Sequence, residues 1–163
     1  MRDGLMILIA TTMLGAAMLL GQGSPSPQGS EGGNPMLYTV GTQKPLATLR
    51  QDVPKACAAH KFGVISIIDL KEKMKEKGVE YVGDCLIFEV CNPQNAKTVL
   101  EAAPEISTAL PCRISAFKGR DGKTQLSTIR PTKLLDLFGS ADLKQVAAEV
   151  ESTVTAIMNE AAR

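Results

Sequence analysis

The chain has 163 residues, of which 18 are basic and 17 acidic, so its formal net charge is +1. A near-neutral chain without a basic block offers no field that would hold a nucleic acid, so we expect no nucleic-acid partner. Aromatic residues make up only 4% and tryptophan is absent, so a core must be built from aliphatic side chains, and the length suits one domain.

Residues 4–21 form an apolar run (GLMILIATTMLGAAMLLG) that follows Arg2 and Asp3. Its length lies on the border between the apolar part of a signal peptide and a membrane-spanning helix. A buried core helix is a poor interpretation, because nothing amphipathic adjoins the run. We therefore expect residues 1–21 to be a signal peptide or a membrane anchor, and both alternatives stay open because no convincing cleavage site ends the run.

Residues 22–35 (QGSPSPQGSEGGNP) contain only glycine, serine, proline and other polar residues. Such a stretch buries too little apolar surface to offset the entropy of ordering it, so we predict a disordered tether. Residues 36–163 then form a single globular domain, which the N-terminal segment places outside the cytoplasm, either exported or anchored in the membrane.

The first half of this domain alternates strands and helices. Period-two alternation and β-branched runs predict strands, whereas apolar residues recurring at three and four predict helices. The predicted elements are a strand at 36–43, a helix at 46–61, a strand at 62–70, a helix at 70–77 and a strand at 81–91. Pro54 is expected to kink the first helix or to restart it with Asp52 as a cap, and Gly78 to end the second.

The second half begins with a helix capped by Asn92, with Pro93 in its first turn, and Pro104 ends it. A strand at 110–118, an Asp-Gly turn, a strand at 123–129, a short helix at 131–138 and a final helix capped by Ser140 follow. The final helix carries an apolar stripe of Leu143, Val146, Ala147, Val150, Val154, Ile157 and Met158. The element order predicts an α+β domain with an antiparallel-rich sheet and long helices on one face.

Several motifs occur in order: HKFGVISIIDLKEKMKEKGVE, IFEVCNP, LPCRIS and, after the turn, IRPTKLL. With these motifs, about residues 36–160 resemble the family catalogued as domain of unknown function 302. The resemblance implies a fold of the TATA-box-binding-protein class, with a curved antiparallel sheet and two main helices behind it, and a tendency to form a homodimer. It implies no activity, because the family is named for lacking one.

Four residues, Asn92, Pro93, Leu110 and Pro111, match positions that recur across the family. Other branches of the family resemble this chain with Phe or Leu where Cys91 and Cys112 stand. This departure argues against an obligatory catalytic role for the two thiols.

Residues 84–113 contain three of the four cysteines. Cys91 ends a strand just before a helix, where the helix dipole lowers a thiol pKa, so a reactive thiolate is one interpretation and a small apolar plug the other. Cys112 lies beside Cys91 if the two strands are antiparallel neighbours, and far from it if they are parallel. In an exported protein a structural disulfide is the common outcome for two neighbouring cysteines.

No spacing typical of a metal site is present, so Cys85, Cys91, Cys112 and His60 are candidate ligands only if the fold brings them together. No cofactor is indicated. Asp69 and Glu89 lie within apolar strands without a catalytic partner, and we expect them to face solvent or to pair with Arg113.

If the domain has a functional site, we expect it where Cys91, Asn92 and Pro93 meet Leu110, Pro111 and Cys112. The first hypothesis is a homodimeric module that binds a small molecule or a protein without catalysis. The alternative is a thiol redox or metal-handling protein that uses Cys91 and Cys112.

Overall fold

The structure is a computed structural model that describes residues 33–139 and 141–163. Three predicted features lie outside the described residues: the signal peptide or anchor at 1–21, residues 22–32 of the tether predicted at 22–35, and the cap Ser140. Over the ranges that are described, no helix has both the length and the apolar character needed to span a bilayer.

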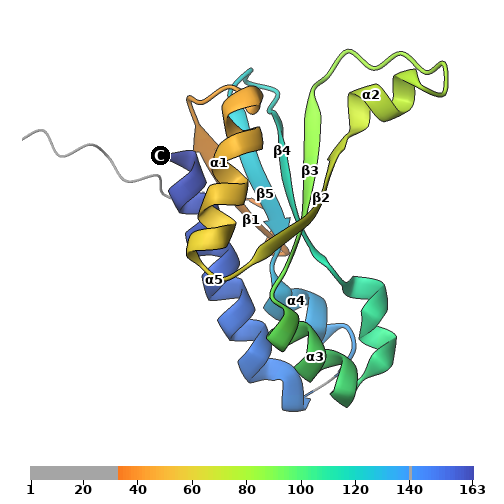
Figure 1. Cartoon of the computed structure of the whole chain (residues 1–163), viewed down its shortest axis with the longest axis vertical. Coiled ribbons are helices and arrows are strands. Elements are labelled where there is room, and N and C mark those ends of the chain that lie inside the picture. Colours follow the sequence, from red (N-terminus) through yellow and green to blue (C-terminus); the bar gives the residue numbers. More distant parts are fainter. Residues whose placement is uncertain (1–32, 140) are drawn as a thin grey trace, which may run out of the picture.

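Five strands form one sheet in the order β1-β5-β4-β3-β2 (Figure 1). Every neighbouring pair is antiparallel, which confirms the predicted sheet type. The strands are β1 (Leu37–Thr42), β2 (Gly63–Asp69), β3 (Cys85–Cys91), β4 (Cys112–Lys118) and β5 (Thr124–Ile129). A bulge between Val64 and Ser66 shifts the register of β2 against β3.

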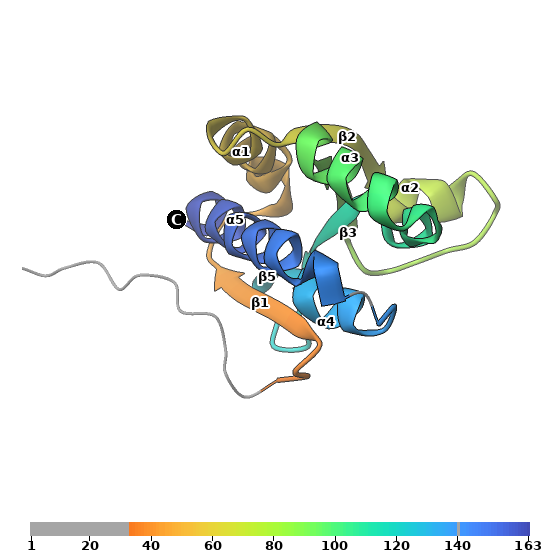
Figure 2. The ribbon, with the colours of Figure 1, turned by 90° about the horizontal axis from the view of Figure 1, so that it is seen from below.

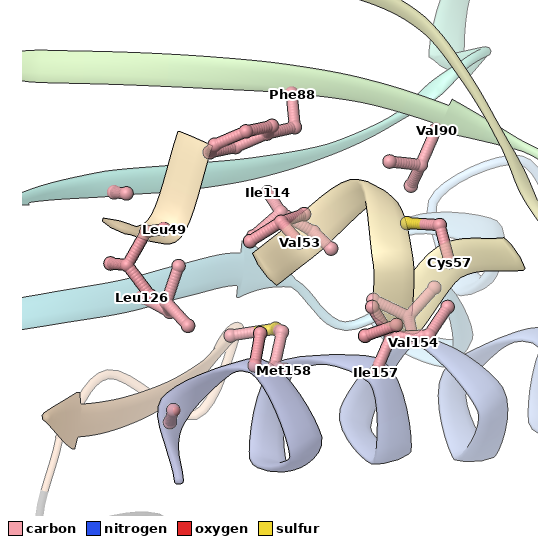
Figure 3. Close-up of a cluster of buried hydrophobic side chains, with 14 of the residues drawn as sticks. Leu49, Val53, Cys57, Phe88, Val90, Ile114, Leu126, Val154, Ile157 and Met158 are labelled. Atoms are coloured by element: carbon pink, nitrogen blue, oxygen red, sulfur yellow. The ribbon is translucent and has the colours of Figure 1, made fainter. Parts of the chain in front are cut away.

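Two helices, α1 (Leu46–Ala59) and α5 (Lys144–Ala162), pack side by side on one face of the sheet (Figures 1 and 2). Between them and the sheet lies the main core, in which the largest side chains are fully buried (Figure 3). Its members include Leu49, Val53 and Cys57 from α1, Phe88 and Val90 from β3, Ile114, Leu126, and Val154, Ile157 and Met158 from α5. Aliphatic residues dominate this core, as the low aromatic content predicts.

A second cluster lies beyond the end of the sheet, where the lower half of α5 continues (Figure 1). An α5 of 19 residues is about 28 Å long. Strands of 6 or 7 residues span only about 20–23 Å, so α5 overhangs the sheet. The overhang is covered by α3 (Pro93–Ala102), α4 (Pro131–Asp136) and two 3-10 helices, η1 (Pro104–Ala109) and η2 (Ala141–Leu143). Val99, Ala103, Ile106 and Leu143 are its buried residues.

The structure corrects several predicted boundaries. Helix α1 runs through Pro54 without a restart, and Asp52 accepts a hydrogen bond from Lys44 Nζ at 2.6 Å instead of capping a helix. The buried face of α1 continues on both sides of the proline, which stabilises the single helix. Strand β3 begins at Cys85, four residues later than predicted, α5 begins at Lys144, and η1 was not predicted.

The short helix α2 (Leu70–Lys75) follows β2 and buries no residue. Asp69 caps it by accepting a hydrogen bond from the Glu72 amide at 3.2 Å. Gly78 adopts φ 73°, the left-handed conformation expected after the helix.

Candidate functional site

Asn92 and Pro93 shape the corner where β3 passes into α3. The Asn92 side-chain oxygen accepts hydrogen bonds from the amides of Gln94 and Asn95, at 3.0 and 3.1 Å, which confirms the predicted cap. Its Nδ2 donates to the Lys61 carbonyl at 3.1 Å and so ties the corner to the residues before β2. All polar atoms of this side chain therefore have structural partners.

The antiparallel register brings the two cysteine segments together. Val90 lies opposite Cys112 across β3 and β4, so Cys91 is one residue away from the position facing Cys112. Because side chains alternate between the faces of a sheet, Cys112 faces the main core with Val90, and Cys91 faces the other side. Cβ atoms that leave opposite faces cannot be bridged without backbone movement. All four cysteines are free, so the expected disulfide is absent.

Of the two interpretations of Cys91, the structure favours the small apolar plug over the reactive, low-pKa thiolate. Burial raises the pKa of the Cys91 thiol above its usual range, and burial together with the nearby Cys91 raises the pKa of Cys112 to about 11. The first free amides of α3 are already bonded to the Asn92 side chain, so they do not stabilise a thiolate at Cys91. Both groups are protonated thiols near neutral pH.

The other candidate metal ligands are also dispersed. His60 Nε2 pairs with Glu160 Oε2 at 2.9 Å, and Cys85 Sγ lies 3.5 Å from Ser115 Oγ. No group of three or more His, Cys, Asp or Glu side chains suited to a metal ion occurs in the portion of the chain that the structure describes. The fold does not bring the four candidate ligands together.

Glu89 forms the expected pair with Arg113 across β3 and β4. Arg113 Nε donates to Glu89 Oε1 at 3.3 Å, and Ser66 Oγ donates to Glu89 Oε2 at 2.7 Å. These bonds hold the pKa of the Glu89 carboxyl below its usual range, the Ser66 bond being the largest cause. Glu89 is thus an ionised, fully engaged carboxylate on the open face of the sheet.

A pocket of about 230 Å³ lies between the end of the sheet and the second cluster. It is lined by residues of η1, the start of β4, the end of β5, α4 and α5. They are Val99, Ile106, Thr108, Ala109, Leu110, Pro111, Cys112, Arg113, Thr128, Ile129, Pro131, Leu134, Leu135, Val146, Ala147 and Val150. Most of these side chains are apolar, and none of them is acidic or a histidine.

Half of the site expected from the sequence belongs to this pocket. Leu110, Pro111 and Cys112 line it, and the Leu110–Pro111 peptide bond is cis. Cys91, Asn92 and Pro93 do not line it, because their segment turns away into the capped start of α3. The two segments are neighbours through the β3–β4 register, but only one of them borders an open space.

The remaining lining residues were not identified from the sequence as a site. Leu134 and Leu135 come from α4, a helix of six residues in which only Pro131 is buried. Val146 and Val150 belong to the predicted stripe of α5 and are half-buried, Val146 against the second cluster and Val150 against the main core. The sequence did contain one signal for this pocket. The apolar stripe of the last helix is longer than any strand of the sheet can cover.

Comparisons with known proteins give a family but no activity. A search of curated proteins finds no match. The crystal structure of an uncharacterized conserved DUF302 protein from Bacillus stearothermophilus superposes with a TM-score of 0.74 at 28% identity, covering 80% of this chain and 100% of that one. The family model for the domain of unknown function DUF302 matches residues 38–161. The chain therefore belongs to the DUF302 family.

Proposed function

We propose that this domain is a non-catalytic binding module that takes a small apolar ligand into the pocket between the sheet and the second cluster. The observation that carries the proposal is the pocket itself, about 230 Å³ in volume, lined by aliphatic side chains and closed on one side by Cys112. Small-molecule sites in proteins are concave and mostly apolar, with a few polar groups that set orientation. Here those groups are the hydroxyls of Thr108 and Thr128.

The size of the pocket bounds the ligand. A dry apolar cavity of about 150 Å³ accommodates benzene. A pocket of about 230 Å³ therefore suits an apolar body of roughly eight or nine carbon atoms. A ligand with a larger body would have to extend through the open side.

Support for a catalytic alternative is weaker. General acid-base chemistry needs a titratable group within hydrogen-bond reach of the substrate, and the residues that line the pocket within the described ranges include no carboxylate and no histidine. The thiol of Cys112 is protonated near neutral pH, because burial raises its pKa to about 11. A thiol redox function at Cys91 and Cys112 would need both a thiolate and a bridge, and the raised pKa and the opposite faces work against each.

Calorimetric titration with octan-1-ol as the probe tests the proposal, since its eight-carbon body matches the volume of the pocket. We expect saturable binding to the full chain. Ala109→Phe should abolish it, because Ala109 is half-buried and lines the pocket. Ala148→Phe is the matched control on the exposed side of α5 and should bind like the parent. Equal binding by all three proteins would place the probe elsewhere and contradict the proposal.

The proposed setting is outside the cytoplasm, with residues 1–21 as signal or anchor, residues 22–35 as tether and the domain as a homodimer. The apolar N-terminal run supports export. Three exposed apolar side chains support association through sheet faces or edges. Leu37 is 37% exposed, Ile65 63% and Ile129 47%. Cell fractionation and analytical ultracentrifugation test the two parts separately. A cytoplasmic soluble protein would contradict export, and a monomer at micromolar concentration would contradict the dimer.

A further inference from the structure

The sheet ends in two edge strands, β1 and β2, which differ in how they are protected. Natural proteins blunt an exposed edge with charged residues, prolines or β-bulges, because its free amides and carbonyls can pair with another chain. Strand β2 contains a bulge between Val64 and Ser66 and ends in Asp69. Strand β1, at the opposite edge (Figure 2), contains no charged residue and no proline, and it pairs with β5 in one unbroken register. β1 is therefore the less protected edge.

The register of β1 against β5 decides which of its backbone groups point outward. The Arg130 amide donates to the Met36 carbonyl at 2.8 Å, across these two strands. In an antiparallel ladder, residues that bond to the neighbouring strand alternate with residues that point away from it. The even-numbered residues of β1 therefore bond to β5, and Leu37, Thr39 and Gly41 direct their backbone groups away from the sheet.

These outward groups allow β1 to pair with the same strand of a second copy about a two-fold axis at Thr39. An interface between identical patches is symmetric, with each contact made twice. Thr39 then exchanges two hydrogen bonds with Thr39 of the partner subunit, and the Gly41 amide donates to the Leu37 carbonyl of the partner subunit. The Leu37 amide takes no part, because it already donates to the Asn34 carbonyl at 2.9 Å. This register pairs all three outward-facing residues.

The side chains are complementary in the same register. Leu37, Thr39 and Gly41 face the open side of the sheet, since Val40 and Thr42, which alternate with them, are buried. Leu37 is 37% exposed and would lie opposite Gly41 of the partner subunit. A Cβ added at Gly41 would meet no atom within 4 Å, so this position has room for a leucine side chain. The two Thr39 side chains would lie opposite each other, a favourable cross-strand pair.

The charged residues that flank this edge are already paired within the chain. Lys44 follows β1 and lies 2.6 Å from the Asp52 carboxylate. Arg130 follows β5 and lies 2.9 Å from Glu151 Oε1. A second copy that approaches β1 therefore does not meet an unpaired charge from either of these two side chains.

We infer that β1 is the edge through which two copies of this chain associate, joining two five-stranded sheets into one continuous antiparallel sheet. The partner is a second copy because this edge is complementary to itself in its hydrogen bonds and in the Leu37–Gly41 contact. The inference rests on the proposed homodimer and names its surface.

A charge placed at Gly41 tests this surface without disturbing the domain, because the added side chain meets no atom of its own chain. Sedimentation velocity of the full chain in a mild detergent should show the parent as a dimer and Gly41→Lys as a monomer. Ile65→Lys is the matched control on the other edge, where Ile65 is 63% exposed, and it should remain a dimer. Equal melting temperatures by circular dichroism check that both variants are folded.

Single cysteines test the register itself. Thr39→Cys would place two thiols directly opposite each other, with Cα atoms about 5.5 Å apart, which a disulfide can bridge. Oxidation should therefore give a cross-linked dimer, and peptide mapping by mass spectrometry should find the bond between the two residues 39. Gly41→Cys is the matched control, since the two residues 41 would lie four positions apart, about 13 Å, and should not cross-link.

The remaining outcomes separate this inference from the proposals on which it rests. A parent that sediments as a monomer would overturn both the proposed homodimer and the β1 edge, and octanol binding to the pocket would be judged independently. A dimer that survives Gly41→Lys, or that dissociates with Ile65→Lys instead, would leave the homodimer standing and overturn the β1 edge. Cross-linking of Gly41→Cys as fast as Thr39→Cys would overturn the register at Thr39.

Discussion

The two hydrophobic clusters of this domain are closed to different degrees. In the main core, the sheet and two long helices leave Phe88, Leu126 and Val154 with no exposed surface. The second cluster is covered by two 3-10 helices and by α3 and α4, of ten and six residues, and a pocket of about 230 Å³ remains inside it. Protein interiors pack to near-crystalline density, and the pocket is a local departure from that packing. The first region therefore specifies the fold, and the second contains the space in which we propose that a ligand binds.

Helix α5 passes through both regions, so charges introduced at two positions of this helix compare them directly. Val154→Asp places an unpaired carboxylate in a fully buried site and should cost roughly 4 kcal/mol or more of unfolding free energy. Val146→Asp, about two turns earlier, lies at a half-buried pocket position beside the second cluster where water can reach the charge, so we expect about 1–2 kcal/mol. Urea denaturation followed by circular dichroism measures both. Equal losses would mean that the overhang of α5 is as tightly enclosed as the main core.

Two buried isoleucines provide a matched pair of truncations. Ile114 in the main core is 0% exposed and Ile106 in the second cluster is 1% exposed. Ile114→Ala should cost about 4 kcal/mol, because its rigid surroundings cannot collapse into the new cavity. Ile106→Ala should cost about 2 kcal/mol, because Ile106 already borders an open pocket and its neighbours can shift. The midpoints and slopes of the urea unfolding curves give both losses of stability. A larger loss for Ile106→Ala than for Ile114→Ala would reverse the assignment of the two regions.

Enlarging a side chain should have opposite signs in the two clusters. Val146→Leu adds a methylene at a half-buried position that lines the pocket, and we expect it to stabilise the domain by about 0.5–1 kcal/mol. Val154→Leu adds the same methylene to a filled core and should destabilise the domain by about 1–3 kcal/mol. The melting temperatures of both variants, measured beside that of the parent, give the sign of each change in stability. A stabilising Val154→Leu would reveal an unfilled space in the main core.

The sequence predicts the first region much better than the second. Strand alternation, the stripes of α1 and α5, and the Asn92 cap are local patterns, and each is found in the structure. The antiparallel sheet follows from their order along the chain. The likeness to the TATA-box-binding-protein fold stays a prediction.

The pocket depends on relations that no local pattern contains. Leu110, Pro111 and Cys112 were identified from their proline and cysteine, and they do line it. Cys91 was expected beside them, but strand alternation sends its side chain to the opposite face. Ile106, Leu134 and Leu135 come from short helices whose packing is fixed only when the overhanging half of α5 meets them. Local propensity places an element, whereas a gap between elements is a property of the assembled domain.

The thiols of Cys57 and Cys112 allow a last comparison, of how easily a reagent reaches each cluster. Burial raises the pKa of Cys57 in the main core and of Cys112 beside the pocket to about 11 in each case. Below about pH 9 both thiols are protonated in the folded and the unfolded chain, so neither makes stability depend on pH there. Above that value the unfolded chain loses these protons first, so stability falls as the pH approaches 11.

At pH 9 a thiol with a pKa of about 11 is about 1% ionised, so both cysteines should react with iodoacetamide about fiftyfold more slowly than an ordinary thiol that is half ionised. Their rates should still rise about tenfold between pH 8 and pH 9. Burial raises both pKa values to about 11, so the two rates are compared at one pH, and the change that Ala109→Phe makes to each rate reports access. We expect Cys112 to react faster than Cys57, since the pocket admits the reagent to one side of it. Ala109→Phe should slow Cys112 and leave Cys57 unchanged, as peptide mapping by mass spectrometry would measure. If Cys57 reacted first, the main core would open more readily than the pocket, and the contrast between the two clusters would be reversed.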